Sequence, residues 1–430
     1  MLVASIGFVA SLLLIFLRVP IALSLATVGF LGFAYLVGLN QAGLMLALIS
    51  RESTMSYGLV VIPLFILMGN FVAGAGISGD LYKAAQAYFG HRRGGLASAT
   101  VLSCGGFAAV CGSSVATVVT IGKVALPSMA KYNYAGSLSA ASVAAGATLG
   151  IIIPPSIMLV IYGIMTETHI GKLYVAGLVP GIMGIIGYLL AVQWSIWGNP
   201  ELAPLAERAS REERRGTLKG IWPICALFFF VVGGIYAGFF TAAEAAGIGA
   251  FGAFILAWAN RRLTWDRFFN ILYDSALTSA MLIALLIGAS VFTEFLNYTG
   301  AHTGLLEFVN GSGLPPVGII LMICAIYVVL GALMEELSMI LLTIPLFFPI
   351  VIGLGYDPVW FGVLVVVLCE LGMIAPPVGV NLFVVRSIAP NIPLIDIVKG
   401  IGPFIVANLV RILIIAVFPA LILFLPDLLF

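Results

Sequence analysis

Two apolar stretches of the sequence are interrupted by a glycine and a pair of prolines at the same spacing. Gly150 begins the run Gly-Ile-Ile-Ile-Pro-Pro, and Gly372 begins the run Gly-Met-Ile-Ala-Pro-Pro, 222 residues later. Proline has no backbone N–H and breaks a helix. Unpaired backbone groups at membrane depth are tolerated only where protein buries them or where they line a cavity. The repeated motif therefore predicts two broken helices that carry a solute or ion site.

Composition places these segments in a lipid bilayer. Hydrophobic residues make up 62% of the chain and charged residues 9%, with a mean hydropathy of +1.18, whereas soluble domains carry about 25% charged residues. A net charge of +1 indicates no basic surface for nucleic acid. Residues 1–17 lack a basic start and a cleavage site, so they are interpreted as a first span and not as a cleaved signal. The chain is predicted to be an all-α polytopic membrane protein.

The first half, residues 1–198, contains five predicted spans. A spanning helix needs about 20 apolar residues. The spans are residues 1–17, 19–38, 58–76, a broken span at 135–163, and 172–197. Residues 80–93 form an amphipathic interfacial arm, and residues 96–129 form a re-entrant hairpin that turns at Gly112, Ser113 and Ser114. The strongly polar run 199–219 is interpreted as a linker between two halves.

The second half, residues 220–430, repeats this plan. Its predicted spans are 220–239, 241–259, 275–297, a broken span at 358–389, and 400–425, with an arm at 265–269. A second re-entrant hairpin covers residues 317–352 and turns at Met334, Glu335 and Glu336. Five spans per half is an odd number, so the halves are predicted to lie in opposite orientations.

The distribution of basic residues supports this inverted repeat. With the N-terminus outside, all lysines and arginines outside the apolar segments fall on the cytoplasmic side except Arg51 and Lys172. Such a bias is typical of membrane proteins, and it makes residues 199–219 a cytoplasmic linker. An inverted repeat with paired broken helices indicates a secondary transporter whose site lies near the midplane.

Oxygen-bearing residues gather at the two breaks and the two hairpin turns. Carbonyl and hydroxyl oxygens suit Na⁺ as the coupling ion without requiring a carboxylate. The predicted first site contains Gly112, Ser113, Ser114, Thr117, Gly150, Pro154 and Ser156. The second contains Gly331, Glu335, Ser338, Gly372, Pro376 and Asn381. Ser113, Ser156, Glu335 and Asn381 are also the candidate substrate contacts. The alternative is that these hydroxyls only pack helices together.

Several ionisable or amide residues lie in or beside the apolar segments. Intramembrane carboxylates are costly and usually functional, and adjacent helical residues point about 100° apart, so one of Glu335 and Glu336 is assigned to the site. Solvation of both at the turn, and proton coupling through one of them, stay open as alternatives. We expect Glu370 to support the second ion site and Glu244 to cap a helix. Further isolated polar residues are expected to bridge helices or to contact a partner: Asn70, Glu294 and Arg411.

Enzymatic functions lack their motifs. The sequence contains no H-E-x-x-H, no G-x-S-x-G and no Walker A motif. Its five cysteines lie in apolar segments and its three histidines lack ligand spacing, which gives no transition-metal site. We therefore expect no enzymatic activity, and no cofactor beyond Na⁺.

The motifs together resemble a known family. Four runs carry the resemblance. From Cys111 the sequence reads Cys-Gly-Ser-Ser-Val-Ala-Thr-Val-Val-Thr-Ile-Gly-Lys-Val-Ala-Leu-Pro-Ser-Met, and from Leu149 it reads Leu-Gly-Ile-Ile-Ile-Pro-Pro-Ser. From Gly177 it reads Gly-Leu-Val-Pro-Gly, and from Leu371 it reads Leu-Gly-Met-Ile-Ala-Pro-Pro-Val-Gly-Val-Asn-Leu. Over essentially the whole chain this resembles the large membrane subunit of tripartite ATP-independent periplasmic (TRAP) transporters. The Met-Glu-Glu at the second turn departs from the Met-Asp that is more usual there.

The resemblance implies a Na⁺-driven importer of elevator type, with a fold like that of the ion-transporter superfamily, in the bacterial inner membrane with a periplasmic N-terminus. Its implied partners are a separate small four-helix membrane subunit and a periplasmic substrate-binding protein. Its implied substrates are organic acids such as C4-dicarboxylates or sialic acid. Two alternatives stay open: a self-sufficient Na⁺- or H⁺-coupled carboxylate transporter without a binding protein, and a channel or structural membrane subunit.

Overall fold

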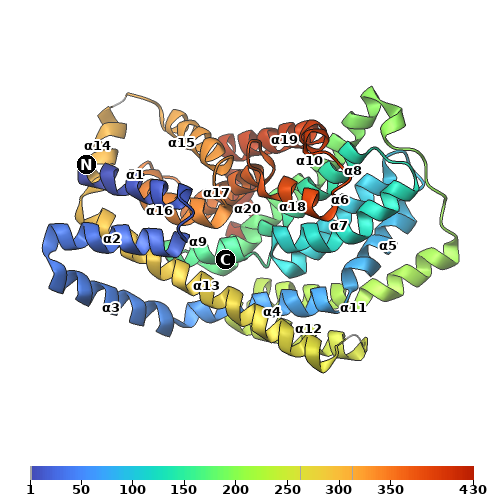
Figure 1. The fold of residues 1–430 in the computed structure, drawn as a ribbon, viewed down its shortest axis with the longest axis horizontal. Helices are drawn as coiled ribbons and strands as arrows, with labels where there is room; N and C mark the ends of the chain where they lie inside the picture. Colours follow the sequence, from blue (N-terminus) through green and yellow to red (C-terminus); the bar gives the residue numbers. More distant parts are fainter. Residues whose placement is uncertain (1, 262, 312) are drawn as a thin grey trace.

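The computed structural model describes residues 2–261, 263–311 and 313–430, and within these ranges it is built of helices without strands. Figure 1 shows an elongated arrangement in which α1–α3 and α14 lie at one end and α5–α8 at the other. Helix α17 (Pro358–Ile374) passes through the interior and is buried at nearly every position. The core therefore lies around one of the two predicted broken helices.

The first half contains the predicted spans and arm. Their observed bounds are α1 (Leu2–Phe16), α2 (Ile21–Val37), α4 (Val61–Gly74), the arm α5 (Ile77–Phe89) and α10 (Ile170–Gly198). Helix α3 (Leu39–Met55) is not one of the predicted spans, because the more polar sequence of residues 41–57 predicts a surface segment there. The predicted hairpin consists of α6 (Gly95–Cys111) and α7 (Ser114–Lys131), which pack against each other. The predicted broken span consists of α8 (Gly136–Thr148), a short 3₁₀ turn (Leu149–Ile151) and α9 (Ile157–Thr166).

In the second half a hairpin is again followed by a broken helix. This half begins with α11 (Arg211–Tyr236), α12 (Ala242–Ala259), α13 (Trp265–Tyr298) and α14 (Ala301–Gly311). The second hairpin is α15 (Pro316–Gly331) with α16 (Glu336–Gly353), and the second broken helix is α17 with α18 (Val380–Ile388). The chain ends in α19 (Leu394–Val417) and α20 (Ala420–Leu429). Both proline pairs contain a cis peptide bond, at Pro154–Pro155 and at Pro376–Pro377.

Three sequence predictions need correction, and α14 is a further helix. The run 199–219 is not linker throughout, because Ser210 and Glu213 form a capping box that starts α11 at Arg211. Residues 265–269 are not a separate arm, because Thr264 caps α13, which then continues without a proline to Tyr298. The last predicted span, 400–425, is divided at Phe418 and Pro419 into α19 and α20. Helix α14 was not predicted, and it lies outside every predicted element.

Six helices among the described residues are long and apolar enough to cross a bilayer by length and composition, and a bent pair of α3 and α4 adds a seventh. The six are α10, α11, α12, α13, α16 and α19. Helix α16 meets this criterion although it is one arm of the predicted re-entrant hairpin; its 18 residues extend about 27 Å at about 1.5 Å per residue. The orientation of the two halves stays a prediction. Arg262, one of the basic residues expected on the cytoplasmic side, lies outside the described residues.

Candidate functional site

The turn of the first hairpin and the first broken helix form one contact, which we call the first junction (residues 112–117 and 150–156). Gly112 ends α6 in a left-handed conformation, with φ +63°, and a Cβ there would lie 2.9 Å from the carbonyl oxygen of Pro155. A Cβ on Gly150 would lie 3.3 Å from the carbonyl of Ser113. Glycine is needed where backbones approach this closely. The sequence therefore brings hairpin turn and helix break together, as the shared motif predicted.

The hydroxyl groups of the first junction mainly satisfy the local backbone. The Oγ of Ser113 accepts from the N–H of Ala116 at 3.4 Å and so caps α7. Thr117 donates to the Ser113 carbonyl at 2.7 Å. Ser156 caps α9 by accepting from the N–H of Leu159 at 3.2 Å, and it donates to the Ile151 carbonyl. Pro154 and Ser156 are buried. Hydroxyl and carbonyl oxygens thus gather in a largely buried site, in the local cap geometry that helix ends require.

The second junction (residues 331–338 and 372–378) is made in the same way from the second half. A Cβ on Gly372 would lie 2.7 Å from both the Cα and the carbonyl oxygen of Gly331, so α15 and α17 touch through their backbones. Val378 donates its N–H to the Ala332 carbonyl at 3.3 Å. Ser338 is buried, whereas Pro376 is exposed. The two predicted sets of glycines therefore lie at equivalent contacts between turn and break.

The two glutamates at the second turn have different environments. Glu335 occupies the N-cap position of α16 without a side-chain cap, and it is exposed. Glu336 is half-buried, and its Oε2 atom is buried without a hydrogen-bond partner. The structure therefore separates the adjacent carboxylates, as the helical geometry predicted. An acceptor that is buried and unpaired is costly, which makes Glu336 the better candidate for a bound cation or proton.

Asn381 lies at the first hairpin and not with the other residues of its predicted set. It is fully buried at the start of α18, and its Nδ2 donates to the Oγ of Ser114 at 2.8 Å and to the Ala144 carbonyl at 2.9 Å. Its Oδ1 is buried without a partner. The assignment of Asn381 to the second site alone is therefore corrected, because the half-helix after the second break extends across to the first half.

The two half-helices that follow the breaks both pack on the opposite half. Helix α18 packs on α7 and α8, and α9 packs on α16 and α17; α18 and α7 can be followed side by side in Figure 1. The hydroxyl of Tyr162 on α9 donates to the Pro358 carbonyl at the start of α17, at 2.6 Å. Each half therefore completes the surroundings of the other half's hairpin.

A buried polar network links the two broken helices. Arg411 on α19 forms an ion pair with Glu370 on α17, one turn before the second break, and donates to Asn408 Oδ1 at 2.7 Å. Asn408 donates to the Tyr188 hydroxyl at 3.3 Å. The same hydroxyl lies 3.0 Å from the Oγ1 of Thr148 at the end of α8. Arg411 thus bridges helices as predicted. Arg411 binds Oε2 of Glu370, and its Oε1 is buried without a hydrogen-bond partner, so the role of Glu370 beside the second ion site stays a prediction.

Other polar residues have structural roles. Asn70 donates to the Ser275 hydroxyl at 2.8 Å and joins α4 to α13, and Glu244 forms a capping box with Thr241 at the start of α12; both expectations are confirmed. Glu294 is half-buried. Among the described residues, no three His, Cys, Asp or Glu side chains gather into a group able to hold a metal ion.

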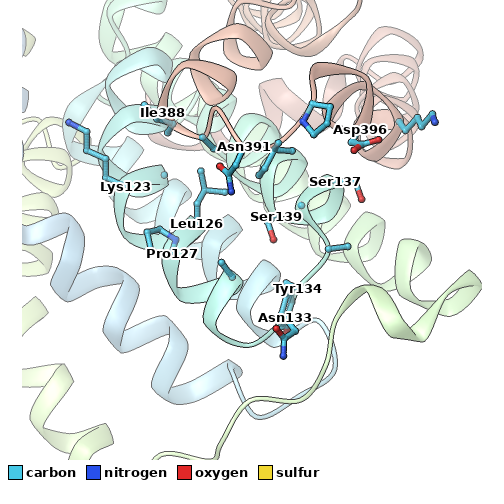
Figure 2. A pocket seen from close by; sticks show the side chains of 18 residues that line it. Lys123, Leu126, Pro127, Asn133, Tyr134, Ser137, Ser139, Ile388, Asn391 and Asp396 are labelled. Atoms are coloured by element: carbon cyan, nitrogen blue, oxygen red, sulfur yellow. The ribbon is translucent and has the colours of Figure 1, made fainter.

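A cleft of about 1000 Å³ lies away from both junctions (Figure 2). It is lined by the C-terminal part of α7, the start of α8, the end of α18 and the start of α19. None of its lining residues belongs to the predicted site sets. Sequence reasoning missed it because its walls come from segments that have no motif in common.

Comparison with known proteins decides the family. Residues 8–421 match the family model described as the DctM component of the tripartite ATP-independent periplasmic transporter. The chain belongs to this family. It is therefore a subunit of a multi-pass membrane transporter and not an enzyme, which confirms the predicted family and class of protein.

Named relatives differ in what they transport. The chain is 36% identical over 378 residues to the C4-dicarboxylate TRAP transporter large permease protein DctM of Pseudomonas aeruginosa, covering 87% of this chain and 88% of that protein. It is 34% identical over 408 residues to the isethionate TRAP transporter permease protein DctMQ of Oleidesulfovibrio alaskensis, covering 94% and 63%. It is 30% identical over 421 residues to the sialic acid TRAP transporter large permease protein SiaM of Vibrio cholerae, covering 96% of each.

The fold also has a solved counterpart. The YdaH transporter of Alcanivorax borkumensis superposes with a TM-score of 0.59 at 15% identity, covering 89% of each chain. At this identity the likeness shows the fold alone. It supports the predicted fold class: an all-α polytopic membrane protein with two helical hairpins and two broken helices.

Proposed function

We propose that this TRAP permease is the membrane subunit of a Na⁺-coupled, binding-protein-dependent importer of organic acids of the C4-dicarboxylate or sialic acid type. The observation that carries the proposal is the pair of junctions, in which a hairpin turn meets a broken helix at equivalent positions of both halves. Broken helices at repeat-related positions are where secondary transporters bind ions and substrate.

Sodium is the coupling ion that best suits the chemistry of the junctions. The first junction offers hydroxyl and carbonyl oxygens and contains no carboxylate, and such oxygens can replace the hydration shell of a monovalent cation. At the second junction Glu336 has an unpaired buried oxygen. Proton binding by this carboxylate is the competing coupling mechanism, and it is separated from Na⁺ coupling in the experiment below.

In the proposed elevator mechanism the hairpins and broken helices move together as a transport unit. Binding of Na⁺ would order the two turns and complete the substrate site, for which Ser113, Ser156, Glu335 and Asn381 are the candidates. The packing of α9 and α18 on opposite halves supports movement of both hairpins as one body, since each hairpin contacts a half-helix of the other half. The remaining helices would form the scaffold.

The proposal includes two partners and a location. The relatives named as permease proteins of TRAP transporters support assembly with a small four-helix membrane subunit and a periplasmic substrate-binding protein. The family supports a location in the bacterial inner membrane, and the distribution of basic residues supports a periplasmic N-terminus. A self-sufficient transporter of the same acids is the second candidate.

Uptake into proteoliposomes tests the proposal. The chain and its small membrane partner are reconstituted, and uptake of labelled succinate, N-acetylneuraminate and isethionate is measured with and without the binding protein. Each is run under an inward Na⁺ gradient or an inward proton gradient. We expect uptake of one acid only with both Na⁺ and the binding protein. Uptake without the binding protein would establish the self-sufficient transporter, and uptake driven by protons alone would reject Na⁺ coupling.

A further inference from the structure

The cleft at the end of α7, α8 and α18 contains the start of a helix that nothing caps. Helix α8 is 13 residues long, and its N-cap residue, Ala135, has no side chain able to accept a hydrogen bond. No acidic residue occupies the first turn of α8. The first backbone N–H groups of a helix have no partner within the helix and attract anions. The start of α8 is therefore a positive end that its own sequence leaves uncompensated.

A second observation at the same place is Ser139, one turn into α8. It is 4% exposed, it lines the cleft, and its Oγ has no hydrogen-bond partner. Ser142, three residues later on the same helix, shows the ordinary arrangement, in which the hydroxyl donates to the Leu138 carbonyl at 2.7 Å. A buried hydroxyl left unpaired is costly. Ser139 thus lacks the partner that a ligand in the cleft would supply.

The rest of the lining adds cationic and neutral donors. Lys123 on α7 and Lys399 on α19 line the cleft and are exposed. Within the described ranges the only ion pair joins Arg411 to Glu370, so neither lysine is neutralised by a carboxylate there. In Figure 2 Lys123 lies at the rim and Asn391 lies between it and Ser139. Asp396 is the single acidic lining residue, and it leaves a formal excess of one positive charge.

We propose that this cleft binds an anionic ligand through a carboxylate or phosphate group. The group would accept from the first N–H groups of α8 and from the Ser139 hydroxyl, with the lysines folding inward from the rim. Ammonium groups and helix N-termini both stabilise such oxyanions. The ligand is either a free anion in solution or the headgroup of an anionic lipid, since both present the same chemistry.

The site is independent of the two junctions but is built on the same helices. Helices α7, α8 and α18 meet at Ser114, Ala144 and Asn381, and the same three helices line the cleft at their opposite ends. A ligand in the cleft therefore joins α8 to the segment between α18 and α19, where the side chain of Ile392 lies 3.3 Å from a Cβ built on Gly136.

Two arms test the proposal on the purified full chain. In the first, inorganic phosphate is titrated by calorimetry into nanodiscs of phosphatidylcholine at constant Na⁺ and constant ionic strength. In the second, retention of phosphatidylglycerol is measured by native mass spectrometry. We expect saturable phosphate binding, or selective retention of the anionic lipid, that weakens about tenfold in Lys123→Ala/Lys399→Ala. Phosphate binding identifies a free anion, and retention without phosphate binding identifies a lipid headgroup.

Matched variants separate the site from general surface charge. Lys131→Ala/Lys219→Ala removes the same charge from exposed lysines that do not line the cleft, and it should leave binding unchanged. Ser139→Ala should weaken binding severalfold, whereas Ser142→Ala should not. The proposal is overturned if neither arm shows binding, or if the two lysine pairs weaken it equally. Each variant is first checked for an unchanged thermal unfolding midpoint. If Ser139→Ala unfolds, the comparison of Lys123→Ala/Lys399→Ala with Lys131→Ala/Lys219→Ala tests the proposal.

Discussion

At the first junction Pro154 and Pro155 are buried, whereas their equivalents at the second junction, Pro376 and Pro377, are exposed. Both junctions otherwise have the same backbone features: a glycine contact between the turn and the break, and a cis peptide bond between the two prolines. The first turn carries hydroxyls, and the second carries Glu335. The two junctions therefore share a backbone arrangement but differ in their surroundings. The first has a buried proline pair and a hydroxyl-bearing turn, and the second has an exposed proline pair and an acidic turn.

This difference suits a transporter that exposes its site to one side at a time. If the two junctions are equivalent gates, a conformation in which one is buried and the other exposed is the expected asymmetric state. If they are not equivalent, the exposure of the second junction is a fixed property. The predictions below separate these interpretations, beginning with the buried network that joins the two breaks.

Breaking the Arg411–Glu370 pair should have the largest effect on stability. The pair is buried, and its network runs from α17 beside the second break to Thr148 beside the first. Removing one partner of such a pair costs about 3–5 kcal/mol because it leaves an uncompensated buried charge. We expect Arg411→Met to lower the thermal unfolding midpoint strongly and to impair both junctions. Arg411→Met/Glu370→Met should regain most of the loss.

The exposed Arg51 supplies the control, because Arg51→Met removes the same charge from the surface. It should change the unfolding midpoint little. If Arg411→Met were no more harmful than Arg51→Met, the network would not couple the two breaks.

Adding a methyl group at the backbone contact of the second junction should have the next largest effect, on uptake. In Gly372→Ala the new methyl group would lie 2.7 Å from two backbone atoms of Gly331, whereas in Gly150→Ala the nearest atom would lie 3.3 Å away. Overpacking costs about 1–3 kcal/mol, and backbone cannot move aside like a side chain. We expect reconstituted uptake to fall further in Gly372→Ala than in Gly150→Ala.

Gly402→Ala on α19 is the matched control, because nothing lies within 4 Å of its added Cβ. Its uptake should match that of the unaltered protein. Equal uptake by Gly372→Ala and Gly150→Ala would show that the two contacts tolerate crowding alike.

Labelling of introduced cysteines sharpens the difference in exposure. Ser156 is buried, and its equivalent at the 222-residue offset, Val378, is 37% exposed. In a Cys225→Ala background, chosen because the other four cysteines are buried, Val378→Cys should react with a soluble maleimide about tenfold faster than Ser156→Cys, since access limits the reaction of a buried thiol. Equal rates would contradict the asymmetry. A Na⁺-dependent reversal would support two equivalent gates.

The helix breaks and hairpin turns were predictable from the sequence because glycine and proline act locally. The Pro-Pro pairs end α17 and separate the 3₁₀ turn from α9 whatever surrounds them, and Ser113 and Ser156 begin helices as N-caps. The start of α11 was also a local signal, the capping box of Ser210 and Glu213, but charge alone made that run look like a linker. Local chemistry therefore located most elements and both glycine contacts.

Contacts between distant segments could not be predicted in this way. Asn381 lies five residues after Pro376 in sequence, yet its side chain bonds to a residue 267 positions away. The cleft depends on Ser139, which no motif distinguishes from Ser142. The pairing of Glu370 with Arg411 had only a weak signal, two opposite charges in apolar spans. Packing of the two halves, rather than local preference, decides these positions.

The position of Asn381 gives the smallest expected effect and tests whether the two junctions act separately. Its Nδ2 donates to Ser114 at 2.8 Å, so Asn381→Ala and Ser114→Ala should be non-additive in unfolding free energy by about 0.5–1.5 kcal/mol, the range for a single hydrogen bond in contact. Asn381→Ala and Glu335→Gln should add within about 0.5 kcal/mol, because they belong to different junctions. The Na⁺ concentration for half-maximal uptake is then measured for the same single and double variants. Non-additive changes in this concentration would show that the Asn381–Ser114 contact affects Na⁺ binding. Additivity with Ser114→Ala together with coupling to Glu335→Gln would return Asn381 to the second junction, where its sequence spacing predicted it.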